Sequence, residues 1–236
     1  DISRSMDAND VVPTRLERVK YDIQQLCDTL PANRFGLIMA SSAPFVLAPL
    51  TSDQDALKQF IREIHTSIAP TGGTDLCSAL ELAYQKLSTD PSTRRSVKAM
   101  VLFSDGENAS SCERNTLIRL RMQGMPIITV GVGSEAGASI RQGRDFIRDD
   151  NNQIVRSRLN RSYLQELARD SRGQYIEADV NGRYINELAG ILQSLKGGTS
   201  DQRRLAVATN KYYYFLLAAL GLIALDILIA IRTFRL

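Results

Sequence analysis

The sequence predicts an α/β fold, in which a doubly wound, mostly parallel sheet is covered by helices on both faces. Two runs, 97–103 and 127–130, are almost wholly apolar, which is typical of strands buried on both faces. Other segments carry apolar residues three and four positions apart, the spacing of amphipathic helices. Strands that alternate with helices in this way indicate a parallel sheet between two helical layers.

The first half of the chain alternates helices with short strands. After an opening loop, Asp1–Met6, the periodicity predicts a helix over 15–30, which Pro31 ends. Short apolar runs at 34–40 and 45–48 predict two strands that form an antiparallel edge. Ser52 or Asp53 can cap the next helix, whose expected inward face comprises Leu57, Phe60, Ile61 and Ile64.

The second half continues the alternation and adds an insertion. Paired glycines place residues 71–75 in a loop, which a helix with Leu76, Leu80, Tyr84 and Leu87 on one face follows. A helix through Leu117 then separates the two buried strands. Between 131 and 160 the pattern lapses, and short apolar stretches on either side of 149–152 predict a hairpin insertion. The expected order ends with a helix between Asn160 and Gly173, a strand at 175–176 and a helix over 181–195.

A long apolar run near the C-terminus predicts a membrane span. Residues 212–231 are almost wholly apolar, and about twenty such residues cross a bilayer core. Tyrosines begin the run and basic residues bracket it, both typical of membrane interfaces. We therefore expect four parts: a domain over 1–195, a linker over 196–211, a transmembrane helix over 212–231 and a short tail over 232–236.

The composition excludes several functions. The chain has 236 residues, 29 basic and 26 acidic, and a formal net charge of +3, too small an excess to indicate nucleic-acid binding. His65 is the single histidine, which rules out a histidine-rich zinc site. Cys27, Cys77 and Cys112 form no C-x-x-C pair, and we expect ordinary thiols rather than a zinc site or a disulfide framework.

Three loops carry hard oxygen donors. Asp1, Ser3 and Ser5 alternate in the opening loop, Thr74 lies in a Gly-Gly-Thr loop, and Asp105 follows the first buried strand. In an open α/β sheet, ligands bind at the carboxyl ends of the strands. Two carboxylates and three hydroxyls, with no nitrogen or sulfur, suit a hard cation such as Mg²⁺. Together the three loops therefore form a candidate site for a hard cation.

The same residues resemble a known site. The D-x-S-x-S of Asp1–Ser5, the Thr74 loop and the Ser-Asp-Gly around Asp105 resemble the metal-ion-dependent adhesion site of von Willebrand factor type A domains, over roughly residues 1–195. The resemblance implies a Rossmann-like, non-enzymatic domain that binds Mg²⁺, or another divalent cation such as Mn²⁺ or Ca²⁺. It implies that Asp1, Ser3, Ser5, Thr74 and Asp105 bind this ion directly or through water. It also implies a protein partner whose carboxylate completes the coordination of the ion.

Five further stretches resemble the Bat (aerotolerance-type) membrane proteins of bacteria: Pro13–Arg18, Arg34–Leu37, Pro49–Asp53, Ser104–Asn108 and Gly131–Ser134. The C-terminal apolar run fits that group too. This resemblance implies an inner-membrane protein with its domain outside the cytoplasm, within a complex linked to stress or aerotolerance. Other membrane subunits and a MoxR-type AAA+ ATPase are the implied partners.

Two other functions stay open at this point. A metal-dependent hydrolase or phosphatase would use Asp1, but no second acid stands at position 3 and no Lys or His is evident as an acid or base near the loops. A structural subunit of a membrane complex would leave the ion site silent.

Among the neighbouring residues, we expect Asp75 to cap the helix that starts at Leu76, whereas Glu107 either orients the Ser-Asp-Gly loop or is solvated.

The position of Asp1 raises an expectation about the sheet. A ligand loop of this kind should follow a central, buried strand. Such a strand cannot be omitted without leaving two neighbouring strands unpaired. We therefore expect the first central strand to be missing from this chain, and to precede Asp1 as an apolar segment in a longer protein.

Overall fold

The computed structural model describes residues 1–69, 73–93, 96–107, 114–143, 145–149, 151–179, 181–197 and 219–221. The chain divides into two units, Asp1–Thr199 and Ser200–Leu236, and the first contains the sheet and the helices that cover it. In the second unit, residues 219–221 are helical. The rest of the expected span over 212–231, most of the expected linker over 196–211 and the tail over 232–236 lie outside the described residues. Within the described ranges, no helix has the length and apolar character needed to cross a membrane.

The central strands form a parallel sheet, as the sequence predicted. β3 (Met100–Ser104), β4 (Ile127–Gly131) and β9 (Tyr175–Glu177) lie in the order β3-β4-β9. Val101 lies opposite Ile128 and Val130 lies opposite Ile176 in parallel register. All five residues of β4 are buried, because β4 has a strand on each side and a helical layer on each face.

A second pair of strands is antiparallel, which confirms the expected edge. β1 (Phe35–Met39) pairs with β2 (Phe45–Thr51). The opening residues lie between this pair and the parallel sheet, because Ile2 N donates to Ala40 O beyond β1 and Asp1 N donates to Phe103 O of β3, each at 3.0 Å. The opening loop is thus held at the carboxyl ends of two strands. A strand before Asp1 stays a prediction.

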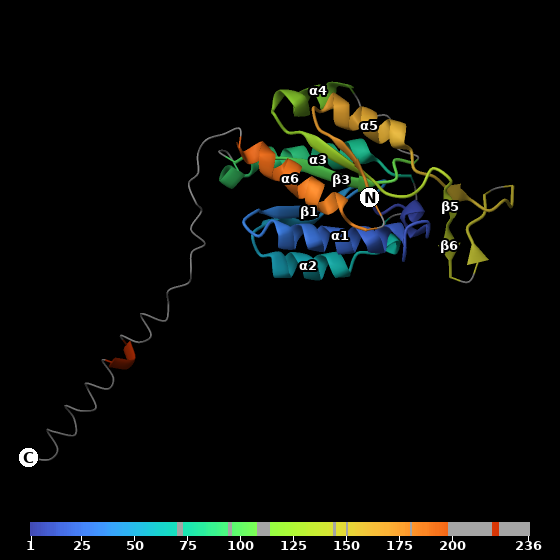
Figure 1. Ribbon diagram of the computed structural model, residues 1–236, viewed down its shortest axis with the longest axis horizontal. Helices are drawn as coiled ribbons and strands as arrows, with labels where there is room; N and C mark the ends of the chain where they lie inside the picture. The colour runs from blue at the N-terminus through green and yellow to red at the C-terminus, as the bar shows by residue number, and fades with distance from the viewer. Residues whose placement is uncertain are drawn as a thin grey trace, which may run out of the picture. The chain divides into compact units, whose positions relative to one another are not determined.

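Six helices of the described chain cover the strands in two layers (Figure 1). One core contains side chains of α1 (Arg15–Thr29), α2 (Gln54–Arg62) and α6 (Tyr184–Gly197), and the other contains side chains of α3 (Leu76–Thr89), α4 (Arg114–Met122) and α5 (Arg161–Asp170). Figure 1 shows α1 and α2 along one side of the strands, and α4 and α5 along the other. The doubly wound arrangement is therefore confirmed.

Side-chain caps fix the starts of four helices. Thr14, Asp53, Asp75 and Asn160 each accept a hydrogen bond from a backbone N–H in the first turn of the helix that follows. Such a cap satisfies a donor that has no partner within the helix. The cap on α3 has a further consequence, because it fixes the position of Thr74, the residue immediately before Asp75.

The segment between β4 and α5 forms the insertion that the sequence predicted. β5 (Ala138–Ser139) pairs with β8 (Arg156–Ser157), and β6 (Arg141–Gln142) pairs with β7 (Asp145–Phe146). An antiparallel bridge between Arg148 and Ile154 closes the outer part. We call residues 138–158 the arm. Three short 3₁₀ helices, η1 (Arg4–Asp7), η2 (Thr66–Ile68) and η3 (Pro91–Thr93), complete the described elements.

Three details differ from the sequence prediction. Phe60 is 45% exposed, because Leu57 and Ile61, one helical turn apart, already fill the inward face of the short helix α2. Val97 is exposed and β3 begins only at Met100. Cys77 is disulfide-bonded, so the expectation of ordinary thiols is wrong for this residue. Pairing of cysteines depends on distance in the folded chain, which sequence spacing does not give. Cys27 is a buried free thiol, and Cys112 lies outside the described residues.

Candidate metal centre

Three loops of the predicted site come together at the carboxyl ends of β1 and β3. The turn after β1 links two of them, since Ala40 O accepts from Ile2 N and Ser41 O accepts from Asp75 N, both at 3.0 Å. Asp1 N donates to Phe103 O and so links the opening loop to the Ser104–Asp105 loop. The predicted convergence of the opening, Thr74 and Asp105 loops is therefore present in the backbone hydrogen bonds.

The opening loop presents its three oxygen-bearing side chains together. Asp1 Oδ1 accepts from Ser3 N at 2.8 Å, and the hydroxyls of Ser3 and Ser5 lie 2.8 Å apart. The 3₁₀ helix η1 starts directly after Ser3, and its tight turn brings Met6 N to 3.0 Å from Ser3 O. The local turn thus explains why alternating donors fall on one side, while Arg4 between them is exposed.

Ser104 links the carboxylate of Asp1 to the turn that follows Asp105. Its hydroxyl donates to Asp1 Oδ2 at 2.6 Å and accepts from Gly106 N at 2.9 Å. Gly106 has a φ of +67°, and an added Cβ would lie 3.0 Å from Leu164 Cγ. Only glycine fits this turn without strain. Ser104 is a positioning residue that the sequence presented merely as part of Ser-Asp-Gly.

Asp105 is buried and strongly bonded. Its Oδ1 accepts from Glu107 N at 3.0 Å, whereas its Oδ2 accepts from Arg15 Nη1 at 2.7 Å and from Ser157 Oγ at 3.1 Å. Its backbone oxygen accepts from Asn160 N at 2.7 Å. The Glu107 backbone therefore helps to orient the loop. The second lone pair of Oδ1 remains available to an ion or to a water molecule on it.

Thr74 is 5% exposed and lies beside the cap of α3. Asp75 Oδ1 accepts from Ser78 N at 2.9 Å and its Oδ2 accepts from Ser78 Oγ at 2.6 Å. These hydrogen bonds lower the pKa of Asp75 below its usual range. The prediction that Asp75 caps α3 is confirmed.

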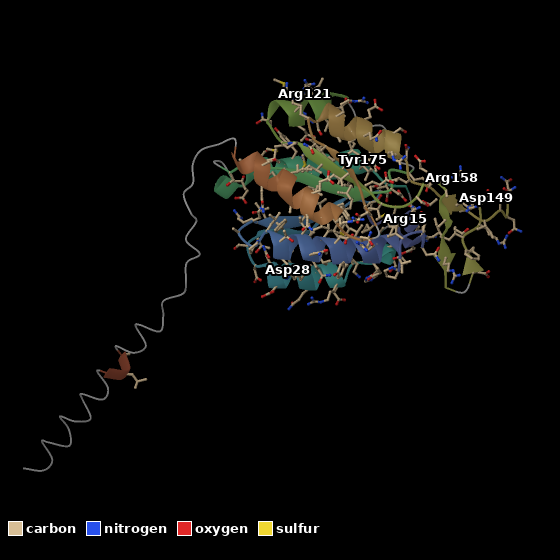
Figure 2. All side chains as sticks on the ribbon, in the orientation of Figure 1. Arg15, Asp28, Arg121, Asp149, Arg158 and Tyr175 are labelled. Carbon is tan, nitrogen blue, oxygen red and sulfur yellow. The ribbon has the colours of Figure 1, made fainter. Side chains whose placement is uncertain are left out.

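Arg15 is the main residue of the site that the sequence did not reveal. Its side chain is fully buried, and besides Asp105 it binds both carboxylate oxygens of Asp10 at 2.8 Å. Burial alone would lower the pKa of this guanidinium, but Asp10 and Asp105 outweigh it and raise the pKa. The sequence contained a signal for its burial, because Arg15 and Asp22 lie at helical spacing with the apolar residues Val19 and Leu26. In the structure all four side chains are on the buried face of α1. Figure 2 labels Arg15 at the end of α1.

Asp10 completes this buried cluster from the other side. Its Oδ2 accepts from the backbone N and the hydroxyl of Ser134, each at 2.8 Å. Burial acts to raise the pKa of Asp10, but the hydrogen bonds and charge of Arg15 together with the Ser134 donors lower it. Asp10 is thus held ionised and offsets the charge of Arg15.

The donor set fits a divalent cation. With Arg15 balanced by Asp10, the carboxylates of Asp1 and Asp105 supply two negative charges, which match a doubly charged ion. The hydroxyls of Ser3, Ser5 and Thr74 add neutral oxygen donors, and Mg²⁺ retains water where the protein supplies too few ligands. Within the described ranges, no group of three or more His, Cys, Asp or Glu side chains is placed to hold a metal ion. The predicted site does not conflict with this finding, because it contains only two carboxylates and its other three ligands are hydroxyls.

The fold and the arrangement of these loops define a class of protein. Residues 1–107 match the family profile of the von Willebrand factor type A domain. The chain belongs to the von Willebrand factor type A family, as its motifs suggested. It is similar to BatB from Bacteroides thetaiotaomicron, with 29% identity, a TM-score of 0.78 and coverage of 84% of this chain and 96% of that one.

Two further relatives support this placement. An aerotolerance-related membrane protein from Bacteroides fragilis is 31% identical, with a TM-score of 0.75 and coverage of 84% of this chain and 96% of that one. A UPF0353 protein of Mycobacterium sp. (strain KMS) is 31% identical over 168 residues, which cover 65% of this chain and 49% of the relative. The chain spans about half the length of the curated relatives that it matches.

Proposed function

We propose that this chain is a membrane-anchored, non-enzymatic module that binds a protein partner through a divalent cation. The observation that supports the proposal is that backbone hydrogen bonds hold three loops together at the ends of β1 and β3. These loops carry the proposed ligands Asp1, Ser3, Ser5, Thr74 and Asp105. Mg²⁺ is the proposed ion, with Mn²⁺ and Ca²⁺ as alternatives. A protein of the same fold from the mussel byssus, 16% identical with a TM-score of 0.55, carries zinc in its adhesion motif.

The residues of the proposed site have two roles, binding the ion and orienting the side chains that bind it. The five oxygen-bearing side chains hold the ion, and when bound it offers a coordination position to a carboxylate of the partner. Ser104 orients Asp1, while Arg15 and Glu107 N orient Asp105. Because these supports are buried or in hydrogen-bonded turns, the ligands are held in place before the ion arrives, which lowers the entropic cost of binding.

A non-enzymatic role accounts for the surroundings of Asp1. Both of its carboxylate oxygens already accept hydrogen bonds, from Ser3 N and Ser104 Oγ, which weakens the carboxylate as a nucleophile. His65 is exposed and η2 follows it. Among the side chains that the structure describes, no lysine or histidine donates a hydrogen bond to the five proposed ligands, which favours the non-enzymatic proposal over the hydrolase.

We place the domain outside the cytoplasm at the bacterial inner membrane. The disulfide at Cys77 supports this, because disulfides persist in oxidising compartments. The apolar run over 212–231 supplies an anchor, and the similar Bacteroides fragilis protein is described as an aerotolerance-related membrane protein. Other membrane subunits and a MoxR-type AAA+ ATPase are the proposed partners, in a complex linked to stress or aerotolerance.

Calorimetric titration of Mg²⁺ into the chain tests the ion site. Thr74→Val removes one proposed ligand while keeping the shape of the side chain, and we expect about ten-fold weaker uptake, the loss typical of a disturbed metal site. Thr89→Val, at the exposed end of α3, is the matched control and should bind like the wild type. Uptake that is absent, or equal in all three chains, would contradict the proposal.

Capture of membrane proteins in Mg²⁺ and in EDTA tests the partner. We expect a protein that is retained in Mg²⁺ and released by EDTA, and that Thr74→Val fails to retain. The chain is also assayed for hydrolysis of p-nitrophenyl phosphate. Hydrolysis that requires Mg²⁺ and is lost in Asp1→Asn would contradict the proposal and support a metal-dependent hydrolase.

A further inference from the structure

The arm is larger than the fold requires. Connections from a strand to the next helix in α/β proteins usually take about 2–6 residues, whereas residues 132–160 separate β4 from α5. β5 and β6 extend outward from the body formed by the helices and central strands (Figure 1). Among the described residues of the arm, Ile140 is a buried apolar residue, but it belongs to neither of the two apolar cores.

Hydrogen bonds hold the segments just before and at the end of the arm beside the candidate metal centre. On the side that enters the arm, Ser134 donates twice to Asp10. On the side that leaves it, Ser157 Oγ donates to Asp105 Oδ2 at 3.1 Å and accepts from Arg15 Nη1 at 2.6 Å. These hydrogen bonds fix the base of the arm beside the proposed ion site. A partner that binds the ion would therefore lie close to the arm.

The sequence of the arm carries a net positive charge, because residues 138–158 include five arginines and three aspartates. Arg141, Arg148, Arg156 and Arg158 are exposed, and Figure 2 labels Arg158 near the base. Among the described residues none of these four guanidiniums forms an ion pair, in contrast to Arg161 of α5, which pairs with Glu135 and Glu177. Of the two described aspartates on the arm, Asp149 is used internally, because its Oδ1 accepts from Asn151 N and Gln153 N.

The charge balance at the proposed ion suggests that these arginines neutralise negative charge on the partner. Asp1 and Asp105 already match the charge of a divalent cation, so a carboxylate from the partner adds an unbalanced negative charge. Guanidinium groups bind carboxylates in a two-pronged geometry that suits them to this task. We infer that the arm is a second contact surface of the metal centre, and that it binds an acidic segment of the partner next to the carboxylate on the ion.

This inference rests on the proposed ion-dependent function, and the test separates the two. The probe is a peptide of about ten glutamates, and its binding to the full chain in Mg²⁺ and in EDTA is measured. The arm variant carries Arg→Gln at positions 141, 148, 156 and 158. A matched control carries the same change at four exposed arginines outside the arm, Arg62, Arg121, Arg169 and Arg172.

We expect the arm variant to bind the peptide at least about ten-fold more weakly than the wild type, with a reduced dependence on salt. The control should bind within about two-fold of the wild type, and Mg²⁺ uptake should be equal in all three chains. Three outcomes would overturn this inference and leave the proposed function standing. They are retained Mg²⁺-dependent binding by the arm variant, an equal loss of binding in the control, and no peptide binding by a wild type that takes up Mg²⁺. Binding that is insensitive to EDTA would overturn the proposed function. Arm-dependent binding to phosphatidylglycerol vesicles instead of the peptide would make the arm a lipid-binding surface and overturn the inference.

Discussion

Arg15 Nη1 lies 2.7 Å from Asp105 Oδ2, and neither side chain is exposed to solvent. The pair joins the start of α1 to the loop after β3, which are 90 residues apart in the chain. Asp10 supplies a second carboxylate to the same guanidinium. The candidate metal centre therefore adjoins a charge cluster of Arg15, Asp10 and Asp105, in which Arg15 holds the Asp105 carboxylate in place.

Removing Arg15 should destabilise the fold strongly. Arg15→Met leaves the buried carboxylates of Asp10 and Asp105 without their cation, and breaking a buried pair in this way costs about 3–5 kcal/mol. Urea denaturation measures the free energy of unfolding. Arg62→Met, in the exposed last turn of α2, is the control and should change it by less than about 0.5 kcal/mol. A loss as small for Arg15→Met as for the control would contradict the structural role of the pair.

Asp10 should make the protein sensitive to acid. Its pKa is lower in the folded chain than the usual 3.8, so the folded state binds fewer protons than the unfolded state. The stability that Asp10 contributes is complete above the unfolded pKa and is lost as the pH falls through the folded pKa. We expect Asp10→Asn to be less stable than the wild type at neutral pH, and the difference to shrink from about pH 5 to pH 2.

Chemical denaturation across this pH range measures the difference. Asp28→Asn is the control, because the Asp28 side chain is 66% exposed and its pair with Lys58 lies at the surface. Such pairs contribute little, so the control should follow the wild type at every pH. A difference between Asp10→Asn and wild type that stays constant down to low pH would contradict the linkage.

The sequence predicted the elements better than it predicted the supports of the site. Apolar periodicity located α1 and α5, and continuous apolar runs located β3 and β4, because burial of whole faces leaves a pattern along the chain. The five proposed ligands were visible as alternating or motif-linked oxygens. The role of Arg15 was not, because Asp105 and Ser157, which it joins, lie 90 and 142 residues away in the sequence. The disulfide at Cys77 was missed for the same reason.

Tyr184 should stabilise the contact between α6 and α1. Its hydroxyl donates to the buried carboxylate of Asp22, whose two oxygens also share a bifurcated hydrogen bond from Arg18 Nε, at 3.0 and 2.8 Å. Burial raises the pKa of Asp22, so this carboxylate depends on its donors. Tyr184→Phe removes one donor and should cost about 1–3 kcal/mol. Tyr21→Phe, at a position 62% exposed on α1, is the matched control, and equal urea midpoints for the two variants would contradict the prediction.

The cysteines should differ in reactivity in a way that tests the disulfide. Cys27 is buried, and burial raises the pKa of its thiol to about 11, so in the native chain it is both shielded and protonated. The reactive species is the thiolate, and we expect no labelling of native Cys27 by iodoacetamide at about pH 8. Unfolding without reductant should allow labelling of Cys27 but not of Cys77, whose sulfur is in a disulfide. Unfolding with reductant should label Cys77 as well, and peptide mass spectrometry distinguishes the two positions. Labelling of Cys77 before reduction would contradict the disulfide, and with it the support that Cys77 gives to an extracytoplasmic domain.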